Sequence, residues 1–251
     1  MLERTPLFEK LRQATHLAHR RLEHRVDIYR PSFAVHNYRR LLQDLWGFYR
    51  PLERKLVVLA DHIFPSRYSQ RWLKAPRLAQ DLLSLGMTEA DIAALPLCGR
   101  LPALPTLPQA FGVQYVIECA ALGERIDGLH VRETLGIDPS LGGSFFSSYD
   151  PRMDLYRQEF ETVMTTAVGE PGPQTLTIEA AIDTFDCFEA WLDYRLRPQR
   201  ASSSQWNVGN VESEPELDKA LHFDSLSGAT ITAQSVESSS TPGSVKAQQC
   251  S

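Results

Sequence analysis

The stretch that decides the fold is Leu11-Arg-Gln-Ala-Thr-His-Leu-Ala-His-Arg-Arg-Leu-Glu23, because it sets two histidines beside a helical apolar stripe. Apolar or small residues recur every three or four positions, which predicts an amphipathic helix with one buried face. The members of this face are Phe8, Leu11, Ala14, Thr15, Ala18 and Leu22. Thr5 followed by Pro6 is typical of a helix start, since proline has no N–H to leave unpaired there. An adjacent strip of the helix carries Arg12, His16, His19 and Glu23.

His19 allows two interpretations from the residues alone. It can be a boundary histidine bonded to a neighbouring carbonyl or to Glu23, which is the usual case for a single histidine. It can also be a metal ligand, because the small neighbours Thr15 and Ala18 leave room for a flat group and Glu23 can orient the ring. The residue types do not decide between the two.

The same stretch resembles the proximal helix of haem oxygenases. In that family the pattern Leu-basic-x-Ala-Thr-x-x-x-His-x-x-x-Glu carries the histidine that ligates haem iron, and residues 11–23 follow it. The resemblance implies that His19 is the axial metal ligand and that Glu23 belongs to the haem-binding set. It also places Arg12 and His16 at the family's basic positions near the haem propionates.

A second stretch carries the resemblance independently of the histidine. Residues 38–53, YRRLLQDLWGFYRPLE, are similar to the bacterial haem oxygenase pattern Tyr-x-x-Leu-Leu-x-x-x-Tyr-Gly-Phe-Tyr-x-Pro-Leu-Glu. Apolar periodicity predicts helix from about Ser32 to Phe64, as two helices or as one with a bend. Pro51 removes a backbone hydrogen bond in its middle, and Gly47 is a small residue that tolerates a kink.

The segment from Ala110 to Leu135 is predicted as a helix whose middle carries only small side chains. Such a surface favours either tight packing against another helix or close approach by a bound group. The segment resembles the distal helix of haem oxygenases, Tyr-Val-x-Glu-Gly-Ser-x-Leu-Gly-Gly, which lies over the haem. The matching residues are Tyr115, Glu118, Leu122 and Gly123.

The resemblance implies that Tyr115 binds haem and that Cys119, Gly123 and Glu124 form the catalytic distal surface. Cys119 and Glu124 stand where the family has glycines. A thiol adds bulk and an oxidisable group where the family's backbone approaches bound dioxygen. Glu124 either points to solvent or joins a distal water network.

The remaining segments predict a helical bundle with a separate tail. Helices are predicted over 71–85, 88–95, 153–168 and 177–195, and a proline-rich surface connection over 96–108. Residues 142–150 resemble the family's Phe-Phe-x-x-Tyr signature, whose aromatics either cover a porphyrin edge or pack in the core. The serine-rich segment 201–251 has few large apolar residues and is predicted to be disordered, which leaves residues 1–200 as the helical domain.

Composition narrows the class of protein. The N-terminal ten residues are charged and no apolar run approaches the roughly 20 residues that span a bilayer, so we expect no membrane segment and a cytoplasmic protein. The four cysteines are widely spaced, which indicates buried or incidental thiols. Basic residues are dispersed along amphipathic helices, a pattern that favours an anionic small molecule or redox partner over nucleic acid.

The sequence therefore predicts an all-α, haem oxygenase-like helical bundle with a disordered C-terminal tail. The resemblance implies degradation of haem, as both substrate and cofactor, by dioxygen and reducing electrons to biliverdin, ferrous iron and carbon monoxide. Its implied partners are a reductase or ferredoxin and, for the product, a bilin-binding photoreceptor. A haem carrier or sensor that leaves haem intact is the alternative. A di-iron oxidase would need Glu-x-x-His pairs on facing helices, and the sequence offers no such set.

Overall fold

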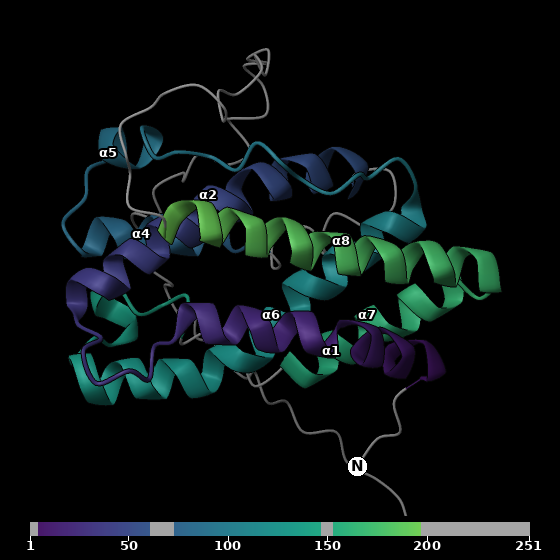
Figure 1. Cartoon of the computed structure of the whole chain (residues 1–251), viewed down its shortest axis with the longest axis horizontal. Helices are drawn as coiled ribbons and strands as arrows, with labels where there is room; N and C mark the ends of the chain where they lie inside the picture. The colour runs from purple at the N-terminus through teal and green to yellow at the C-terminus, as the bar shows by residue number, and fades with distance from the viewer. Residues whose placement is uncertain (1–4, 61–72, 147–152, 197–251) are drawn as a thin grey trace, which may run out of the picture. The chain divides into compact units, whose positions relative to one another are not determined.

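The computed structural model describes residues 5–60, 73–146 and 153–196, and in these ranges the chain forms helices and connections without strands. Figure 1 shows the elements, which are α1 (Pro6–Val26), α2 (Val35–Ala60), α4 (Ala75–Ser84), α5 (Glu89–Ala93), α6 (Leu107–Leu135), the 3-10 turn η2 (Pro139–Leu141), α7 (Met153–Ala167) and α8 (Pro171–Leu196). The predicted all-α fold is confirmed. None of the helices in the described ranges is long and apolar enough to cross a membrane.

Helix α8 is the element against which both α1 and α6 pack most extensively. The α6–α8 crossing is close because Gly112 brings the two backbones together. A Cβ at this position would lie 2.9 Å from Ala180 Cβ and 2.9 Å from Ala181 N, and would also collide with the carbonyl oxygen of Thr177. Since any side chain larger than hydrogen would push the helices apart, Gly112 sets the position of α6 on α8.

The far end of α8 is joined to α2 by hydrogen bonds to one buried residue. Trp191 Nε1 donates to the Asp44 carbonyl oxygen at 2.7 Å, and Arg195 Nε donates to the Asp44 carboxylate at 2.6 Å. Because all three residues are buried, these bonds satisfy polar groups that water does not reach. They hold α8 and α2 in a fixed register.

Helix α2 continues through Pro51, so the alternative of two helices over 32–64 is wrong for its described part. Proline leaves the carbonyl of Gly47, four residues back, without its helical donor. The backbone N–H of Cys98 supplies the missing donor at 2.8 Å. A Cβ on Gly47 would lie only 2.5 Å from Pro96 O and 2.5 Å from Trp191 Cζ2, so the glycine also makes room for this contact.

The proline-rich connection before α6 lies at the surface, as the sequence predicts, but part of it is buried against the core. It passes over α2, and three of its side chains are buried: Cys98, Pro102 and Leu104. The hydrogen bond from Cys98 to α2 explains this burial, because it draws the chain onto the helix. Cys98 and Cys187 are buried free thiols, as expected for these two cysteines.

The buried face of α1 differs from the predicted stripe at Ala14, while Leu22 is only half-buried and Leu7 is an additional buried residue. Leu7, Phe8, Leu11, Thr15 and Ala18 are buried, whereas Ala14 is exposed. At about 100° per residue, Ala14 lies at the edge of the stripe, on the side away from His19. Helix α8 also begins six residues before the predicted start at Thr177, because Pro171 and Pro173 occupy its first turn, where a missing N–H costs nothing.

The turn after η2 is fixed by a buried carboxylate from α4. Asp81 accepts the backbone N–H groups of Ser144 at 2.9 Å and Phe145 at 2.7 Å. Phe145 and Phe146 are consequently buried, where they contact the rings of Tyr49 and Tyr38. Packing is thus the role of these two phenylalanines, while residues 147–152 of the same signature lie outside the described ranges.

Candidate functional site

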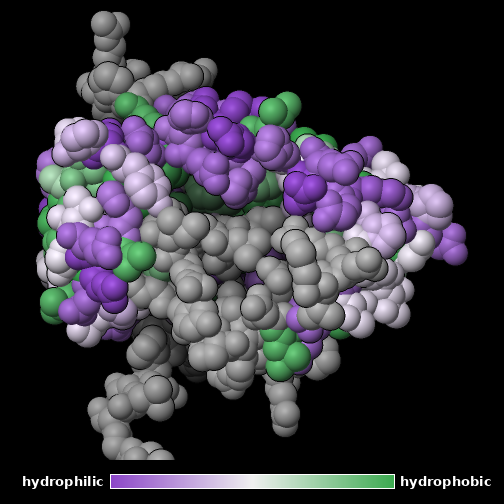
Figure 2. All heavy atoms as spheres, turned by 90° about the horizontal axis from the view of Figure 1, so that it is seen from below, coloured by the Kyte–Doolittle hydropathy of each residue, from purple (hydrophilic) through white to green (hydrophobic). Residues whose placement is uncertain are grey.

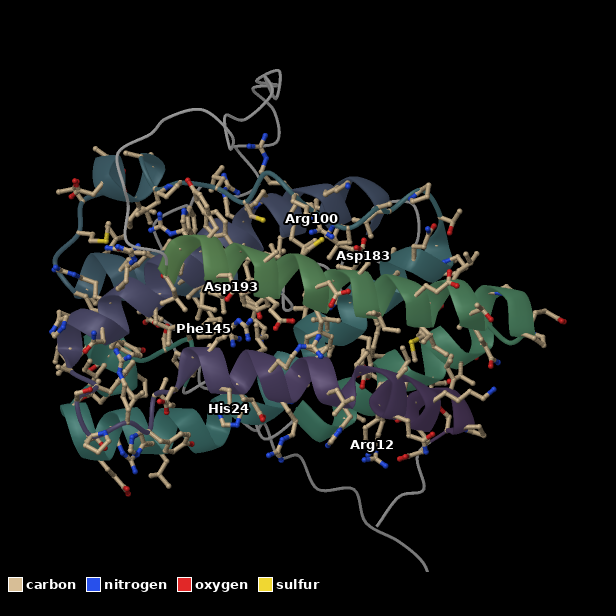
Figure 3. The ribbon with its side chains drawn as sticks, viewed as in Figure 1. Arg12, His24, Arg100, Phe145, Asp183 and Asp193 are labelled. Atoms are coloured by element: carbon tan, nitrogen blue, oxygen red, sulfur yellow. The ribbon has the colours of Figure 1, made fainter. Side chains whose placement is uncertain are left out.

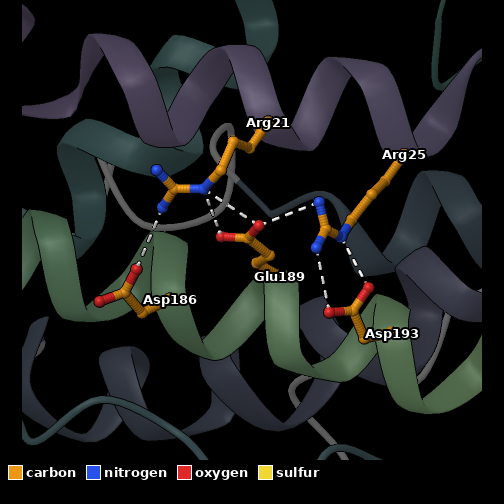
Figure 4. Close-up of polar contacts among 5 residues, drawn as sticks. All are labelled: Arg21, Arg25, Asp186, Glu189 and Asp193. Atoms are coloured by element: carbon orange, nitrogen blue, oxygen red, sulfur yellow. Dashed lines mark hydrogen bonds and ion pairs between the residues drawn. The ribbon is translucent and has the colours of Figure 1, made fainter.

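One side of α1 is held on α8 by a network of ion pairs (Figure 4). Arg21 Nε lies 3.0 Å from Glu189 and Arg25 Nη1 lies 3.0 Å from the other oxygen of the same carboxylate. Arg25 Nε also reaches Asp193 at 2.6 Å, and this hydrogen bond raises the pKa of Arg25. Asp186 completes the network at 3.6 Å from Arg21.

The network leaves a different side of α1 for His19. At about 100° per residue, His19 is turned by roughly 160° from Arg21 around the helix axis, so the two side chains leave α1 on nearly opposite sides. The ion pairs and the candidate strip of Arg12, His16, His19 and Glu23 therefore border the face of α1 that packs on α8 from its two sides. The acidic residues of α8 are spaced to meet Arg21 and Arg25, a complementary charge pattern that sequence reasoning missed.

Two neighbours orient the His19 ring. Its Nδ1 lies 3.3 Å from Oε1 of Glu23, one helical turn away. The ring of Phe185 on α8 meets it edge to face, with 5.9 Å between centroids and 83° between planes. The side chain of His19 is 36% exposed, so the ring lies at the boundary between the core and solvent.

This geometry assigns different roles to the two ring nitrogens of His19. A neutral imidazole has one N–H and one lone pair, and the Glu23 carboxylate favours the proton on Nδ1. Nε2 then carries the lone pair. Within the described residues, no hydrogen-bond or ion-pair partner meets Nε2. The residues present therefore fit a metal ligated by one imidazole whose other nitrogen is oriented by a carboxylate.

The other candidate residues of α1 lie along its exposed side. His16 is exposed, and Arg12 is exposed with Nε and Nη2 at 3.0 and 2.9 Å from Oε2 of Glu9. Figure 3 shows Arg12 and His24 on the side of α1 that is turned away from α8. Figure 2 looks onto this side from below and shows hydrophilic side chains with apolar ones recessed beside them.

The small neighbours of His19 face the core. Thr15 and Ala18 are both buried, and the Thr15 hydroxyl donates to the Leu11 carbonyl at 2.8 Å, so it needs no further partner. Ala18 belongs to a hydrophobic cluster of α1, α6, α7 and α8 that also contains Phe8 and Phe185. The edge-to-face contact of Phe185 with the His19 ring is the feature of this site for which the sequence carries no signal.

Tyr115 joins α6 to the start of α1. It is buried, and its ring meets Phe8 edge to face with 5.4 Å between centroids. The helix predicted over 110–135 is confirmed as α6, which runs through the positions of Cys119, Gly123 and Glu124. The side chains of these three residues lie outside the described part of the structure. No group of three or more His, Cys, Asp or Glu side chains that could hold a metal ion occurs in the described ranges.

Comparison with known proteins identifies the family. The family model for heme oxygenase matches residues 5–194, and the chain therefore belongs to the haem oxygenase family, whose members are oxidoreductases that bind and act on haem. Its fold is similar to that in "Crystal Structures of the NO-and CO-Bound Heme Oxygenase From Neisseria Meningitidis: Implications for Oxygen Activation", with a TM-score of 0.61 and 15% sequence identity. The match covers 75% of this chain and 91% of that one. No curated protein matches the sequence significantly.

Proposed function

We propose that this chain binds haem through His19 and degrades it, with dioxygen and reducing electrons, to biliverdin, ferrous iron and carbon monoxide. The observation that carries the proposal is the pairing of His19 Nδ1 with Glu23 at 3.3 Å, which favours the proton on Nδ1 and so leaves the lone pair on Nε2, where it can bind a metal. Membership of the haem oxygenase family supports the reaction class.

The candidate residues of α1 would hold the iron and the propionates of haem. Nε2 of His19 would hold the iron, and Glu23 would keep the ring in the orientation that the structure shows. Arg12 and His16 would bind the propionates, with Arg12 exchanging its exposed contact to Glu9 for a haem carboxylate. Haem, when bound, supplies both the ring that is cleaved and the iron that activates dioxygen.

The α6 side of the site would be formed by the segment after Tyr115. Tyr115 would fix the start of this segment against Phe8, while the backbone and side chains at Cys119, Gly123 and Glu124 would exclude bulk water and orient dioxygen. A shallow helix surface is needed for this, and the small residues Ala120 and Ala121, which follow Cys119 in the sequence, would provide it.

Electrons would come from a reductase or a ferredoxin. The exposed side of α1 carries Arg12, His16 and Arg20, which would attract an acidic donor to the helix that bears His19. We further propose that residues 1–200 carry the activity in the cytoplasm, that 201–251 form a separate tail, and that biliverdin is either released or passed to a bilin-binding photoreceptor.

Haemin titration of the purified chain tests the proposal. We expect binding at about one to one, with an iron–histidine stretching mode in the resonance Raman spectrum of the ferrous complex. His19→Ala should abolish this mode, whereas the control His16→Ala should keep it. An unchanged Soret band and stretching mode in His19→Ala would assign the ligand to another residue, with His16 as the first to examine.

A second function is favoured by the sequence of α6. Cys119 and Glu124 replace glycines of the family pattern. If their side chains fill the space above the iron, the chain would bind haem without degrading it and would act as a carrier or sensor. Haemin titration does not separate these two functions, but turnover in air does.

A further inference from the structure

His130 attaches the C-terminal part of α6 to the connection between α1 and α2. Its Nε2 lies 3.2 Å from the carbonyl oxygen of Ile28, and its ring lies over Tyr29 with 4.4 Å between centroids and 36° between planes. Its Nδ1 lies 3.4 Å from Thr134 Oγ1. A proton on Nε2 satisfies both polar contacts, because Nε2 then donates to the carbonyl and Nδ1 accepts from the hydroxyl. We call the pair Tyr29 and His130 the clasp.

Within the described residues, ring contacts join α6 to the α1 region at the clasp and at a second position nearer the start of α6. The second is the contact between Phe8, near the start of α1, and Tyr115 on α6. At a rise of about 1.5 Å per residue, Tyr115 and His130 are about 22 Å apart along α6. His19 lies between the two contacts on the α1 side, and the proposed distal segment 119–124 lies between them on the α6 side.

Both helices pack mainly on α8 within the described ranges, and less on each other. The separation of α1 and α6 around His19 therefore depends on how their ends are joined. Loss of the clasp would not unfold the end of α6, because Val131 is buried in the main core cluster together with Ile28 and Ile137. It would instead let this end of α6 move relative to α1.

We propose that Tyr29 and His130 are positioning residues for the haem site, which hold the C-terminal part of α6 at a fixed separation from α1 and so set how tightly haem is enclosed. This inference rests on the proposed function. Neither residue is expected to touch the iron, and each acts through the placement of α6.

The test combines the apoprotein with the haem complex. Hydrogen exchange of the apoprotein measures how often the amides of residues 128–135 become exposed to solvent. The rate at which the haem complex releases haem to an excess of a second, haem-scavenging protein measures how tightly haem is enclosed. For His130→Ala and Tyr29→Ala we expect about tenfold faster exchange in this segment and about tenfold faster haem release. His130→Gln keeps an amide donor for Ile28 and should recover part of the loss.

Two controls separate positioning from general destabilisation. Glu133→Ala changes an exposed residue of the same turn and should leave exchange and haem release as in wild type. Ile92→Val removes a buried methyl group from α5, so it should lower the thermal midpoint without accelerating haem release.

The proposal is overturned if His130→Ala and Tyr29→Ala release haem as Ile92→Val does, or if exchange in residues 128–135 is unchanged. Tyr29 is 52% exposed, so its variant should fold even if that of His130 does not. A wild type that fails to bind haem would contradict the proposed function, and exchange in the apoprotein would still decide whether the clasp holds α6.

Discussion

At the scale of single residues, the carboxylate of Glu23 tests whether His19 is oriented as an iron ligand. Glu23→Gln keeps an oxygen close to Nδ1 but removes the negative charge. The imidazole is then a weaker electron donor to the iron. We expect haem affinity to fall by about tenfold, and the iron–histidine stretching mode to move to lower frequency. Glu89→Gln removes the same charge from the exposed surface of α5 and should change neither quantity. A stretching mode that is identical in Glu23→Gln and wild type would contradict the assigned role.

The burial of Glu53 where α2 meets α4 predicts that the stability of the fold depends on pH. Its carboxylate accepts the backbone N–H groups of Lys74 and Ala75, yet burial outweighs these bonds and raises its pKa from 4.5 to about 7. The folded state thus binds this proton more tightly than the unfolded state. The resulting stability is complete below pH 4.5 and is lost as the pH rises to about 7.

Urea denaturation of wild type and Glu53→Gln between pH 4.5 and 7.5 measures this contribution. Over that range the unfolding free energy of wild type should fall by roughly 3 kcal/mol relative to the variant, because glutamine does not titrate. Parallel pH profiles for the two proteins would show that Glu53 does not take up a proton in the folded state.

The sequence predicts some residues of the site and not others for a physical reason. His19 and Glu23 are four positions apart, so their contact follows from helical geometry alone. Phe185 reaches His19 only because α8 packs on α1, and a contact of that kind has no local pattern. The ion pairs of Arg21 and Arg25 could be predicted only in part. The spacing of the two arginines is evident in the sequence, but their acidic partners are brought to them by the packing of α8 on α1.

At the scale of elements, the close α6–α8 crossing predicts the effect of enlarging Gly112. Gly112→Ala should push α6 away from α8 and destabilise the fold by about 1–3 kcal/mol. Haem affinity should fall as well, because α6 would form one side of the proposed site. Gly172→Ala is the matched control, since a Cβ at this position of α8 has no atom within 4 Å and should be neutral or slightly stabilising.

Thermal denaturation and haemin titration of the two glycine variants check this prediction. A Gly112→Ala variant as stable as wild type would mean that the helices separate without cost. Loss of stability with unchanged haem affinity would instead show that the position of α6 on α8 does not influence haem binding.

Helix ends follow local rules, and most were predictable. Thr88 caps α5 with its side chain, and Gly136 ends α6 in the left-handed conformation. The passage of α2 through Pro51 was not predictable, because it depends on a donor from Cys98 that arrives from a distant part of the chain. The same tertiary contact explains why the connection before α6 is partly buried.

At the scale of the whole molecule, the first prediction concerns the C-terminal tail. Deleting residues 201–251 should leave haem affinity and the thermal midpoint essentially unchanged, because the segment has too few large apolar residues to pack stably. The family match ends at residue 194, before this segment. A fall of several degrees in the midpoint of the truncated chain would show that the tail packs on the helical domain.

The fold as a whole was predictable because three sequence segments match one family in order, and each of them forms the expected helix. The state of the distal surface was not predictable from the same match. A match to a family pattern indicates how the backbone folds. The effect of Cys119 and Glu124 on haem degradation instead depends on a few tenths of an ångström of space above the bound haem.

Single-turnover absorbance in air tests the central claim most directly. The ferric haem complex of the full chain is supplied with ascorbate or a reductase system, and wild type is compared with Cys119→Gly/Glu124→Gly. We predict that wild type loses its Soret band while the broad red absorption of biliverdin rises, because the neighbouring small residues let α6 accommodate both side chains. Intact haem in wild type, with bilin formed only by the double variant, would contradict the claim and make this chain a haem-binding protein without degrading activity.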